Sequence, residues 1–322
     1  MSTAFVTGGS GFIGGVLIER LRREGWDVRA LARSDAAAAR VGELGAEPVR
    51  GDLEDRRALE QGAAGSEVAF HCAAKVEDWG DPEEFERLNV FGTQNALDAC
   101  IAAGVRRFVH AGTEASLTVG QPLVNVSEDA PLRPDSPILY AASKARAEQR
   151  VRAANGDGIE TVVIRPRFVW GRGDTTLLPA LIKLIESGRF RWIGGGTQLT
   201  DTTNVDNTVE GLWLGATRAP PGSVYFVTDG EPVVFREFVT NWLGTQGVSV
   251  PDKTVPGAVA DAAAAVSERA WRLLKRPGSP PLTRMAVWAS SKECTLDISR
   301  ARRELDYKPV VSREQGLAAL SP

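Results

Sequence analysis

The feature that most constrains the fold of this chain is a glycine-rich turn close to its N-terminus. The apolar run 4–7 is followed by Gly8, Gly11 and Gly14, which lead directly into an amphipathic helical pattern over 14–24. Glycines at this spacing permit a tight turn that brings backbone N–H groups close to a ligand, and the N-terminus of the following helix favours an anion. A strand, turn and helix in this order are typical of a unit that binds a dinucleotide pyrophosphate. Taken alone, the same glycines also suit a turn without a ligand.

The first half of the chain alternates short apolar or β-branched runs with longer helical patterns. Strands are expected at 4–7, 28–32, 47–50, 68–72, 107–111 and 161–164, and helices at 14–24, 56–62, 83–103 and 140–154. This alternation indicates βαβ units with right-handed crossovers, so the carboxyl ends of the strands meet at one edge, where a ligand crevice forms. The expected fold class is α/β, a Rossmann-type doubly wound parallel sheet.

After Arg165 and Pro166 the regular alternation of strands and helices ends, and the following segments are interrupted by glycine and proline. A smaller C-terminal lobe is expected from here, interleaved with a late strand of the sheet at 223–228. The expected division is a dinucleotide-binding domain over 1–169 plus approximately 198–228, and a substrate-binding lobe over approximately 170–197 and 229–322.

The composition is that of a globular protein with a large core. The 322 residues are 43% hydrophobic and 25% charged, with a formal net charge of −3. No basic stripe is present, so nucleic acid is not an expected partner. Residues 1–15 show no charged-then-apolar leader, which favours a cytoplasmic location. The stretch 258–274 is interrupted by Asp261, Glu268 and Arg269, so an amphipathic helix is expected there and not a membrane span.

The cysteines and histidines do not form a metal-binding pattern. Cys72, Cys100 and Cys294 have no paired spacing, and only His71 and His110 could join them. The expectation is buried free thiols and no metal site.

The end of the second strand bears on cofactor choice. An NAD enzyme usually places a carboxylate there to bind the ribose 2′-hydroxyl, whereas this chain has Ala32 followed by Arg33. A guanidinium can bind a 2′-phosphate with two hydrogen bonds, so NADP(H) is the preferred cofactor and NAD(H) stays compatible. The alternatives are that Arg33 is a solvated loop cation and that Asp35 serves as the carboxylate.

A second motif carries acid–base chemistry. Tyr140 and Lys144 are four residues apart in a predicted helix and therefore share one face. A nearby ammonium stabilises a phenolate and lowers the tyrosine pKa toward the range of general acid–base catalysis. An isolated pair of this kind is far more often an accidental surface pair, but here it follows a predicted dinucleotide turn.

Together these motifs resemble the short-chain dehydrogenase/reductase superfamily, extended class, in which NAD-dependent epimerases and dehydratases are also found. The likeness is greatest to its 3β-hydroxysteroid dehydrogenase and 2-alkyl-3-oxoalkanoate reductase branch. The matching stretches span nearly the whole chain: VTGGSGFIGG, GDLED, FHCAAKVEDWG, LNVFGTQN, RFVHAGTEA, YAASKARAE, VVIRPRFVWGRGD, DTTNVDN, PPLTR and ARRELDYKP.

The resemblance implies a set of cofactor contacts. In the glycine turn these are the three glycines with Phe12 and Ile13. Beyond the turn they are Asp52 with Leu53 beside the adenine, Ala73, Ala74 and Lys75 along the cofactor, Asn89 as a support of the active site from its helix, and Pro166, Arg167, Phe168 and Val169 over the nicotinamide. It also implies that Tyr140, Lys144 and a hydroxyl residue form the catalytic group. That hydroxyl falls on Thr113, with Ser116 as the alternative if the register differs. Thr113 and Tyr140 would then bind the substrate oxygen, and Lys144 the nicotinamide ribose.

Two rival functions use the same scaffold. A nucleotide-sugar dehydratase of this class needs an acidic pair after the catalytic threonine, where this chain has Glu114 and Ala115. Nucleotide-sugar enzymes also generally carry an arginine at the position of Thr200. A non-catalytic nicotinamide-sensing regulator could dispense with Tyr140 and Lys144, so their presence disfavours that reading.

The preferred reading is an NADP(H)-dependent oxidoreductase that interconverts a secondary alcohol and a ketone on a bulky, largely apolar substrate. Glu114, Trp79 and Trp170 are candidate substrate contacts, although a buried tryptophan is most often part of a core. The 258–274 segment is a candidate apolar lid, and it could equally be an oligomer contact in a homodimer. Asp201 and Asp206 are expected to order loops.

Overall fold

A computed structural model describes residues 2–321; Met1 and Pro322, at the outer ends of the two expected domains, lie outside the described residues. Its centre is a seven-stranded sheet in the order β12-β7-β5-β4-β1-β2-β3, and every neighbouring pair is parallel. The strands are β1 (Thr3–Thr7), β2 (Asp27–Ala32), β3 (Glu47–Arg50), β4 (Val68–His71), β5 (Arg107–Ala111), β7 (Glu160–Pro166) and β12 (Val224–Val227). Strand order reverses between β1 and β4, which is where a doubly wound sheet opens its ligand crevice.

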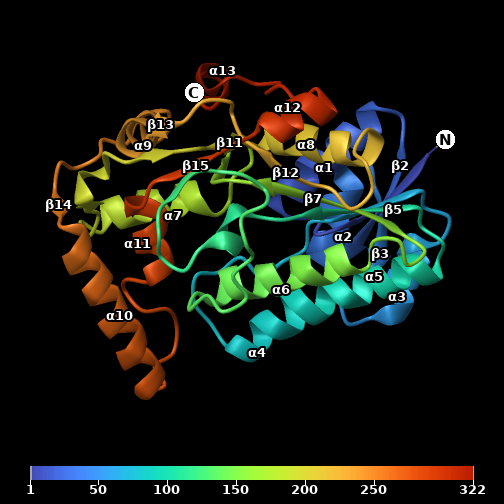
Figure 1. The fold of residues 1–322 in the computed structure, drawn as a ribbon, viewed down its shortest axis with the longest axis horizontal. Helices are drawn as coiled ribbons and strands as arrows, with labels where there is room; N and C mark the ends of the chain where they lie inside the picture. The colour runs from blue at the N-terminus through green and yellow to red at the C-terminus, as the bar shows by residue number, and fades with distance from the viewer. Residues whose placement is uncertain (1, 322) are drawn as a thin grey trace.

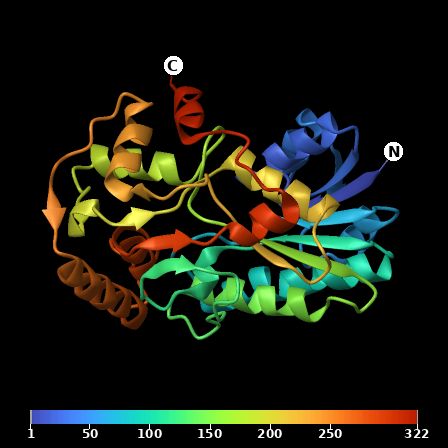
Figure 2. The ribbon, with the colours of Figure 1, turned by 45° about the horizontal axis from the view of Figure 1, so that its top comes forward.

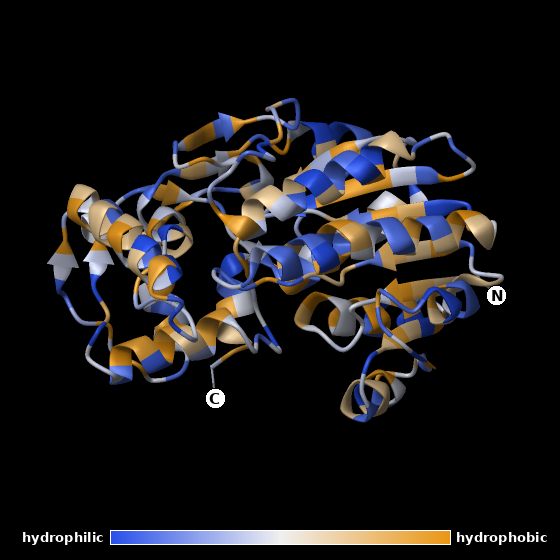
Figure 3. Cartoon of the chain, turned by 90° about the horizontal axis from the view of Figure 1, so that it is seen from below, coloured by the Kyte–Doolittle hydropathy of each residue, from blue (hydrophilic) through white to orange (hydrophobic). Residues whose placement is uncertain are grey.

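Helices cover both faces of this sheet (Figures 1 and 2). One face carries α1 (Phe12–Arg23), α2 (Asp35–Glu43) and α8 (Val205–Thr217), and the other carries α3 (Arg56–Ala63), α5 (Gly92–Ala102) and α6 (Leu139–Ala153). Alternation along β1 explains the two layers, because Ala4 and Val6 pack into one hydrophobic cluster and Phe5 into the other. The covering helices accordingly show hydrophilic and hydrophobic stretches in alternation (Figure 3).

The expected strands are confirmed with small shifts of their ends. The bounds of β3 and β5 match the expectation, and β7 is longer at both ends than the expected 161–164. The expected helix over 83–103 is three pieces: α4 (Pro82–Phe85), a π-helical stretch η1 (Glu86–Phe91) and α5. Helix α2 was not expected, although Ser34 caps its N-terminus by accepting a hydrogen bond from the N–H of Ala37.

Most of the remaining elements lie at the carboxyl ends of the sheet strands, left of the sheet in Figure 1, whereas α12 (Ser299–Leu305) packs beside β12. They include a four-stranded sheet in the order β13-β10-β15-β6 and two strand pairs, β11-β8 and β14-β9. The strands are β6 (Leu123–Val126), β8 (Val169–Trp170), β9 (Trp192–Ile193), β10 (Leu199–Thr200), β11 (Thr203–Asn204), β13 (Val233–Val234), β14 (Thr254–Val255) and β15 (Cys294–Leu296). The helices are α7 (Leu177–Glu186), α9 (Phe235–Gly244), α10 (Gly257–Leu273), α11 (Arg284–Ser291), α12 (Ser299–Leu305) and α13 (Arg313–Ala318), with short 3-10 turns η2 (Glu114–Leu117) and η3 (Gly194–Gly196).

An aromatic cluster gives this C-terminal part its own core. Trp170, Trp192, Trp242 and Phe238 are buried together, and the rings of Phe238 and Trp242 stack with centroids 5.6 Å apart. Within residues 2–321, no helix is long and apolar enough to cross a membrane.

Candidate active site

A cavity of about 470 Å3 opens at the carboxyl edge of the sheet. Its wall combines the glycine turn, the ends of β4 and β5, the start of α6, the β7–β8 segment and helix α11. The predicted site residues on this wall are Gly8, Gly11, Phe12, Ile13, Gly14, Ala74, Thr113, Glu114, Tyr140, Pro166, Phe168 and Val169. The cavity therefore joins most of the predicted cofactor contacts to the predicted catalytic tyrosine.

The glycine turn is shaped for close approach of backbone. A Cβ on Gly14 would lie 2.1 Å from the carbonyl oxygen of Gly8, and one on Gly8 would lie 2.6 Å from the backbone nitrogen of Ala73. Gly8 also has a φ of +73°, a conformation that favours glycine. The turn thus presents backbone at the start of the twelve-residue helix α1, which fits the pyrophosphate of a dinucleotide.

Arg33 follows β2 and is exposed to solvent. Among residues 2–321 its side chain has no hydrogen-bond or ion-pair partner, whereas the neighbouring Asp35 is 3.1 Å from Nη2 of Arg50. The carboxylate that could have bound a ribose hydroxyl is therefore already paired, and the guanidinium of Arg33 is not.

Asp52 and Leu53 form the turn after β3. The carboxylate of Asp52 accepts hydrogen bonds from the backbone N–H groups of Glu54, at 2.9 Å, and Asp55, at 3.2 Å. The Leu53 side chain is buried and packs beneath Gly92 of helix α5. Asp52 therefore shapes this turn through one carboxylate oxygen, and the side chain of Leu53 belongs to the core.

Asn89 ties the loop after β4 to helix α6. Its Oδ1 accepts from the N–H of Lys75 at 2.6 Å, and its Nδ2 donates to the Lys75 carbonyl at 3.1 Å and to Ser143 Oγ at 2.9 Å. The Nζ atom of Lys75 is held by Glu77 at 2.8 Å and Glu84 at 3.0 Å. Asn89 thus fixes the backbone at Lys75 against helix α6, whereas the side chain of Lys75 is committed to carboxylates.

Tyr140 and Lys144 lie one turn apart at the start of α6. Lys144 Nζ donates to the carbonyl oxygen of Ala111 at 2.7 Å and lies 3.1 Å from Nε2 of His110. Burial lowers the pKa of Lys144 to about 8. Burial and the carboxylate of Glu114 raise the pKa of Tyr140 above its usual value, against the opposing effect of Thr113. The phenol is therefore a proton donor at neutral pH unless further positive charge stabilises its anion.

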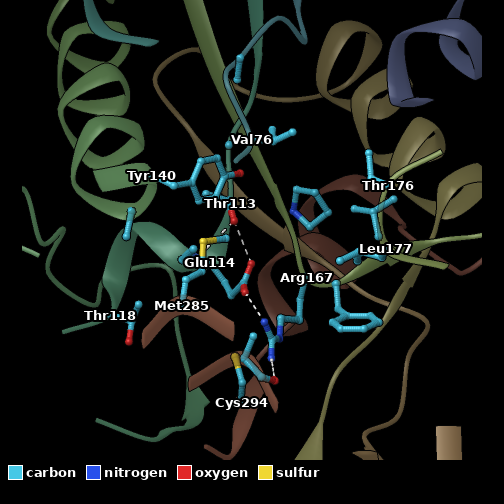
Figure 4. A pocket seen from close by; sticks show the side chains of 18 of the residues that line it. Val76, Thr113, Glu114, Thr118, Tyr140, Arg167, Thr176, Leu177, Met285 and Cys294 are labelled. Atoms are coloured by element: carbon cyan, nitrogen blue, oxygen red, sulfur yellow. Dashed lines mark hydrogen bonds and ion pairs between the residues drawn. The ribbon is translucent and has the colours of Figure 1, made fainter. Parts of the chain in front are cut away.

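Thr113 lies two residues beyond the end of β5, caps the 3-10 turn η2 and begins a buried series of side-chain contacts. Its Oγ1 donates to Oε2 of Glu114 at 2.9 Å, and Glu114 Oε1 accepts from Nη1 of Arg167 at 2.7 Å. Figure 4 shows Tyr140, Thr113, Glu114 and Arg167 following one another along the cavity wall. The hydroxyl of Ser116 donates to the backbone carbonyl of Thr113 at 2.7 Å, and Thr113 borders the cavity whereas Ser116 does not.

The tryptophans are placed differently from the expectation. Trp170 is fully buried in the aromatic cluster, donates from Nε1 to Asp229 at 2.7 Å and does not border the cavity. Trp79 also lies off the cavity wall, beneath the guanidinium of Arg272. Trp288, on α11, is the tryptophan that lines the cavity. The positions of the tryptophans in the sequence do not show which of them line the cavity and which lie in the core.

The helix that borders the cavity is α11 and not α10, which contains the candidate lid segment 258–274. Helix α10 packs on the outer side of α11, held by Glu268, which accepts from Arg284, and by Asp261, which accepts from Nε1 of Trp288. Met285 and Trp288 of α11 border the cavity, whereas no residue of α10 does. The 258–274 segment is thus the amphipathic helix expected, but it supports the cavity wall from behind.

The structure also places the three cysteines and the two aspartates that were expected to order loops. Cys100 and Cys294 are buried free thiols, whereas Cys72 is only half-buried. Among residues 2–321, no group of three histidine, cysteine or acidic side chains could hold a metal ion. Asp201 accepts from the N–H of Leu296 at 2.7 Å, and Asp206 pairs with Arg172 at 3.2 Å.

Comparison with known proteins agrees with this geometry. A ketoreductase of 4-hydroxy-2-methyl-3-oxo-4-farnesyl-3,4-dihydroquinoline-1-oxide from Stigmatella aurantiaca is 48% identical over 98% of this chain and 95% of its own. A 2-alkyl-3-oxoalkanoate reductase from Stenotrophomonas maltophilia is 38% identical over 98% and 97%. The solved structure of MoeE5 with UDP-glucuronic acid and NAD has a TM-score of 0.74 at 27% identity, covering 98% of this chain and 97% of that one.

The family model that matches covers most of the chain. Residues 5–256 match the model of the 3-beta hydroxysteroid dehydrogenase/isomerase family. The glycine turn and the Tyr140–Lys144 pair lie within this match, as does the cavity wall apart from helix α11 and residues 292–294. This chain belongs to the 3-beta hydroxysteroid dehydrogenase/isomerase family.

Proposed function

We propose that this protein is a nicotinamide-dependent oxidoreductase that interconverts a ketone and a secondary alcohol on a bulky, largely apolar substrate. The observation that carries this proposal is one continuous cavity that borders both the glycine turn and the hydroxyl groups of Tyr140 and Thr113. Relatives at 48% and 38% identity are named as reductases of ketones.

The chain's own residues divide the chemistry between them. A bound nicotinamide nucleotide would supply or accept the hydride. In the reductive direction Tyr140 donates its phenolic proton to the substrate oxygen, so its O–H bond breaks as the alcohol O–H bond forms. The ammonium of Lys144 stabilises the phenolate left behind, and the glycine turn holds the pyrophosphate.

The cavity wall favours hydrocarbon. Phe168, Leu177, Met285 and Trp288 line the same cavity as Tyr140 with apolar side chains, and the last three come from the proposed substrate-binding lobe. Burying hydrocarbon there would contribute roughly 25 cal/mol per Å2. The two relatives' names specify a farnesyl and an alkyl group, in agreement with such a wall.

We further propose NADP(H) as the preferred cofactor. Arg33 is an exposed cation at the end of β2 without a partner among the described residues, while Asp35 is paired with Arg50. A 2′-phosphate could bind this guanidinium through charge-assisted hydrogen bonds.

A nucleotide-sugar epimerase or dehydratase is the second candidate, favoured by the UDP-glucuronic acid bound in MoeE5. Two positions count against it here. Ala115 leaves the acidic pair of a dehydratase incomplete, and Thr200 is buried and offers no charge to a diphosphate. A purely regulatory role has no feature of its own in its favour.

Steady-state kinetics would test the proposal. NADPH oxidation is measured with a panel of long-chain β-keto esters, ketosteroids and UDP-sugars, and the products are identified by mass spectrometry. The proposal predicts stoichiometric alcohol formation from at least one bulky ketone and no turnover of UDP-sugars. Conversion of a UDP-sugar together with no ketone reduction would reject it.

A further inference from the structure

The outer face of helix α10 carries a row of exposed apolar side chains. Val259, Val266 and Leu273 follow one another at intervals of seven residues, so they lie nearly in line along the helix. They are 55%, 69% and 73% exposed, and Leu274, directly after the helix, is 62% exposed. The other exposed residues between Val259 and Leu273 are alanines and two arginines. Single exposed apolar residues are ordinary on a protein, but a continuous row of them indicates an interaction surface.

The exposed charges of this face are all positive. They are, within the helix and directly after it, Arg269, Arg272, Lys275 and Arg276. The two acidic residues of α10 are instead held by neighbouring side chains. Asp261 Oδ2 lies 3.0 Å from Nζ of Lys292, and Glu268 is buried and accepts from Nε of Arg284 at 2.7 Å. Along α10, therefore, no carboxylate is exposed that could neutralise the cations.

The position of α10 leaves this face open. Figures 1 and 2 show the helix at the outer edge of the C-terminal part, away from the seven-stranded sheet. Its opposite face packs through Ala260 and Ala264, in a cluster with Val287 of α11. The outer face therefore points away from the rest of the chain, where a flat surface can reach it.

The combination of apolar and positive residues distinguishes between partners. In a two-fold contact between two copies the face would pack on itself, and α10 offers no exposed carboxylate to its own cations. A nucleic acid would pair with the cations but leave the apolar row in water. Arg269 lies three residues after Val266 and four before Leu273, so it borders the row. An apolar row bordered by cations suits the boundary between the headgroups and acyl chains of a bilayer.

We propose that the outer face of α10 binds the surface of a lipid bilayer that carries anionic headgroups. The row from Val259 to Leu274 enters the boundary region, and the cations meet the phosphates. The bilayer then lies one helix away from the cavity, because α11 contributes Met285 and Trp288 to the cavity wall.

Co-sedimentation with lipid vesicles tests the proposal on the full chain. At about 50 mM NaCl, vesicles of equimolar phosphatidylglycerol and phosphatidylcholine should bind the protein at least about tenfold more strongly than vesicles of phosphatidylcholine alone. At about 500 mM NaCl this preference should fall severalfold, because the cations are exposed and salt screens them.

Two sets of variants separate the apolar row from the charges. Val266→Asp should weaken binding to the phosphatidylglycerol vesicles at least about tenfold. Val310→Asp is its matched control, since Val310 is 50% exposed but lies between α12 and α13.

For the charges, Arg269→Glu combined with Lys275→Glu should also weaken binding at least about tenfold. Arg23→Glu combined with Arg57→Glu changes the net charge equally, at exposed positions of α1 and α3, and should leave binding within about twofold of the wild type. Thermal melting of each variant shows that its fold is kept.

Three results would overturn the proposal. The first is a wild type that does not bind the phosphatidylglycerol vesicles, and the second is a Val266→Asp variant that melts and binds like the wild type. The third is a dimer in analytical ultracentrifugation that Val266→Asp dissociates while vesicles bind neither protein, which would assign the face to a second copy. Because the vesicle assay requires no turnover, its failure would leave the proposed ketone reduction standing.

Discussion

Lys144 Nζ lies 3.1 Å from Nε2 of His110, which points at it from the neighbouring strand β5. His110 is fully buried, and burial together with the ammonium keeps its pKa well below the usual value, so its ring is neutral and can accept from the lysine. The backbone carbonyl of Ala111 accepts a second hydrogen bond at 2.7 Å. The lysine is thus oriented by strand β5, and such preorganisation would serve the proposed acid–base role of Tyr140.

Tyr140→Phe should lower turnover by several orders of magnitude and leave the Kd for NADPH nearly unchanged. The change deletes the proton donor but keeps the ring that packs on the cavity wall. Tryptophan fluorescence titration would give the Kd, and steady-state kinetics would give kcat. Lys144→Ala should damage both quantities. A Tyr140→Phe enzyme with wild-type kcat, under conditions where chemistry limits the rate, would remove the tyrosine from the mechanism.

Glu114→Gln should shift the pH dependence of alcohol oxidation. Oxidation needs the phenolate of Tyr140, and the carboxylate of Glu114 raises the pKa of that phenol. Removing the negative charge lowers the pKa, so the rise of activity with pH should occur at lower pH in the variant. The measurement is the profile of kcat/KM against pH. Glu293→Gln is the control, because Glu293 also lines the cavity but does not contact Thr113 or Arg167. A midpoint that stays at the wild-type pH would contradict the coupling.

Arg33→Asp should reverse the cofactor preference from NADPH toward NADH. The change replaces a cation at the 2′ position with a carboxylate that can accept from a ribose hydroxyl. Arg40→Asp, an equally exposed charge reversal on α2, is the control. Comparing kcat/KM for the two cofactors decides the matter, and a wild-type enzyme that prefers NADH would show the interpretation of Arg33 to be wrong.

Gly14→Ala should abolish cofactor binding, whereas Gly15→Ala should leave it within a few-fold of the wild type. A Cβ on Gly14 would lie 2.1 Å from the Gly8 carbonyl oxygen and would open the turn, but one on Gly15 meets nothing nearer than 3.4 Å. Isothermal titration with NADPH measures both. Equal Kd values for the two variants would mean that the turn does not hold the cofactor.

Acid should destabilise the protein through its buried histidines. Burial and then the charge of Lys144 lower the pKa of His71 to about 3. The unfolded histidine binds a proton near its usual pKa of about 6.5, so stability is complete above that pH and falls by about 1.4 kcal/mol per pH unit per histidine below it. His71→Gln can still bond to the hydroxyls of Thr7 and Thr93, which hold the ring at 2.8 and 2.9 Å, but it does not titrate. The free energy of unfolding, measured by urea titration between about pH 7 and pH 5, should fall less steeply with decreasing pH in this variant than in the wild type. An unchanged dependence on pH would exclude His71 as a cause.

The sheet could be predicted from the sequence because burial on both faces gives nearly continuous apolar strands. Val68 to His71 and Arg107 to Ala111 are fully buried, so their runs stand out from the flanking turns. Helix α2 was missed because only Val41 of it is buried, which leaves a run of alanines without a clear amphipathic pattern.

The candidate site also contains some contacts that the sequence could predict and others that it could not. Tyr140 and Lys144 are neighbours on one helix, so their spacing alone brings them together. Glu114 and Arg167 are 53 residues apart and meet only because β5 and β7 are adjacent in the sheet. Which tryptophan faces the cavity depends on the packing of α11 against α10, and no local pattern in the sequence encodes it.

Hydride transfer to a bulky ketone is the central claim, and isotope transfer tests it most directly. The wild-type enzyme is incubated with benzoin and NADPH in which both C4 hydrogens are replaced by deuterium, and the alcohol product is analysed by NMR. The account predicts one deuterium at the new carbinol carbon for each cofactor oxidised, and none when Tyr140→Phe replaces the wild type at equal cofactor occupancy. Oxidation of the cofactor without deuterium in the product, or product formation undiminished in Tyr140→Phe, would contradict it.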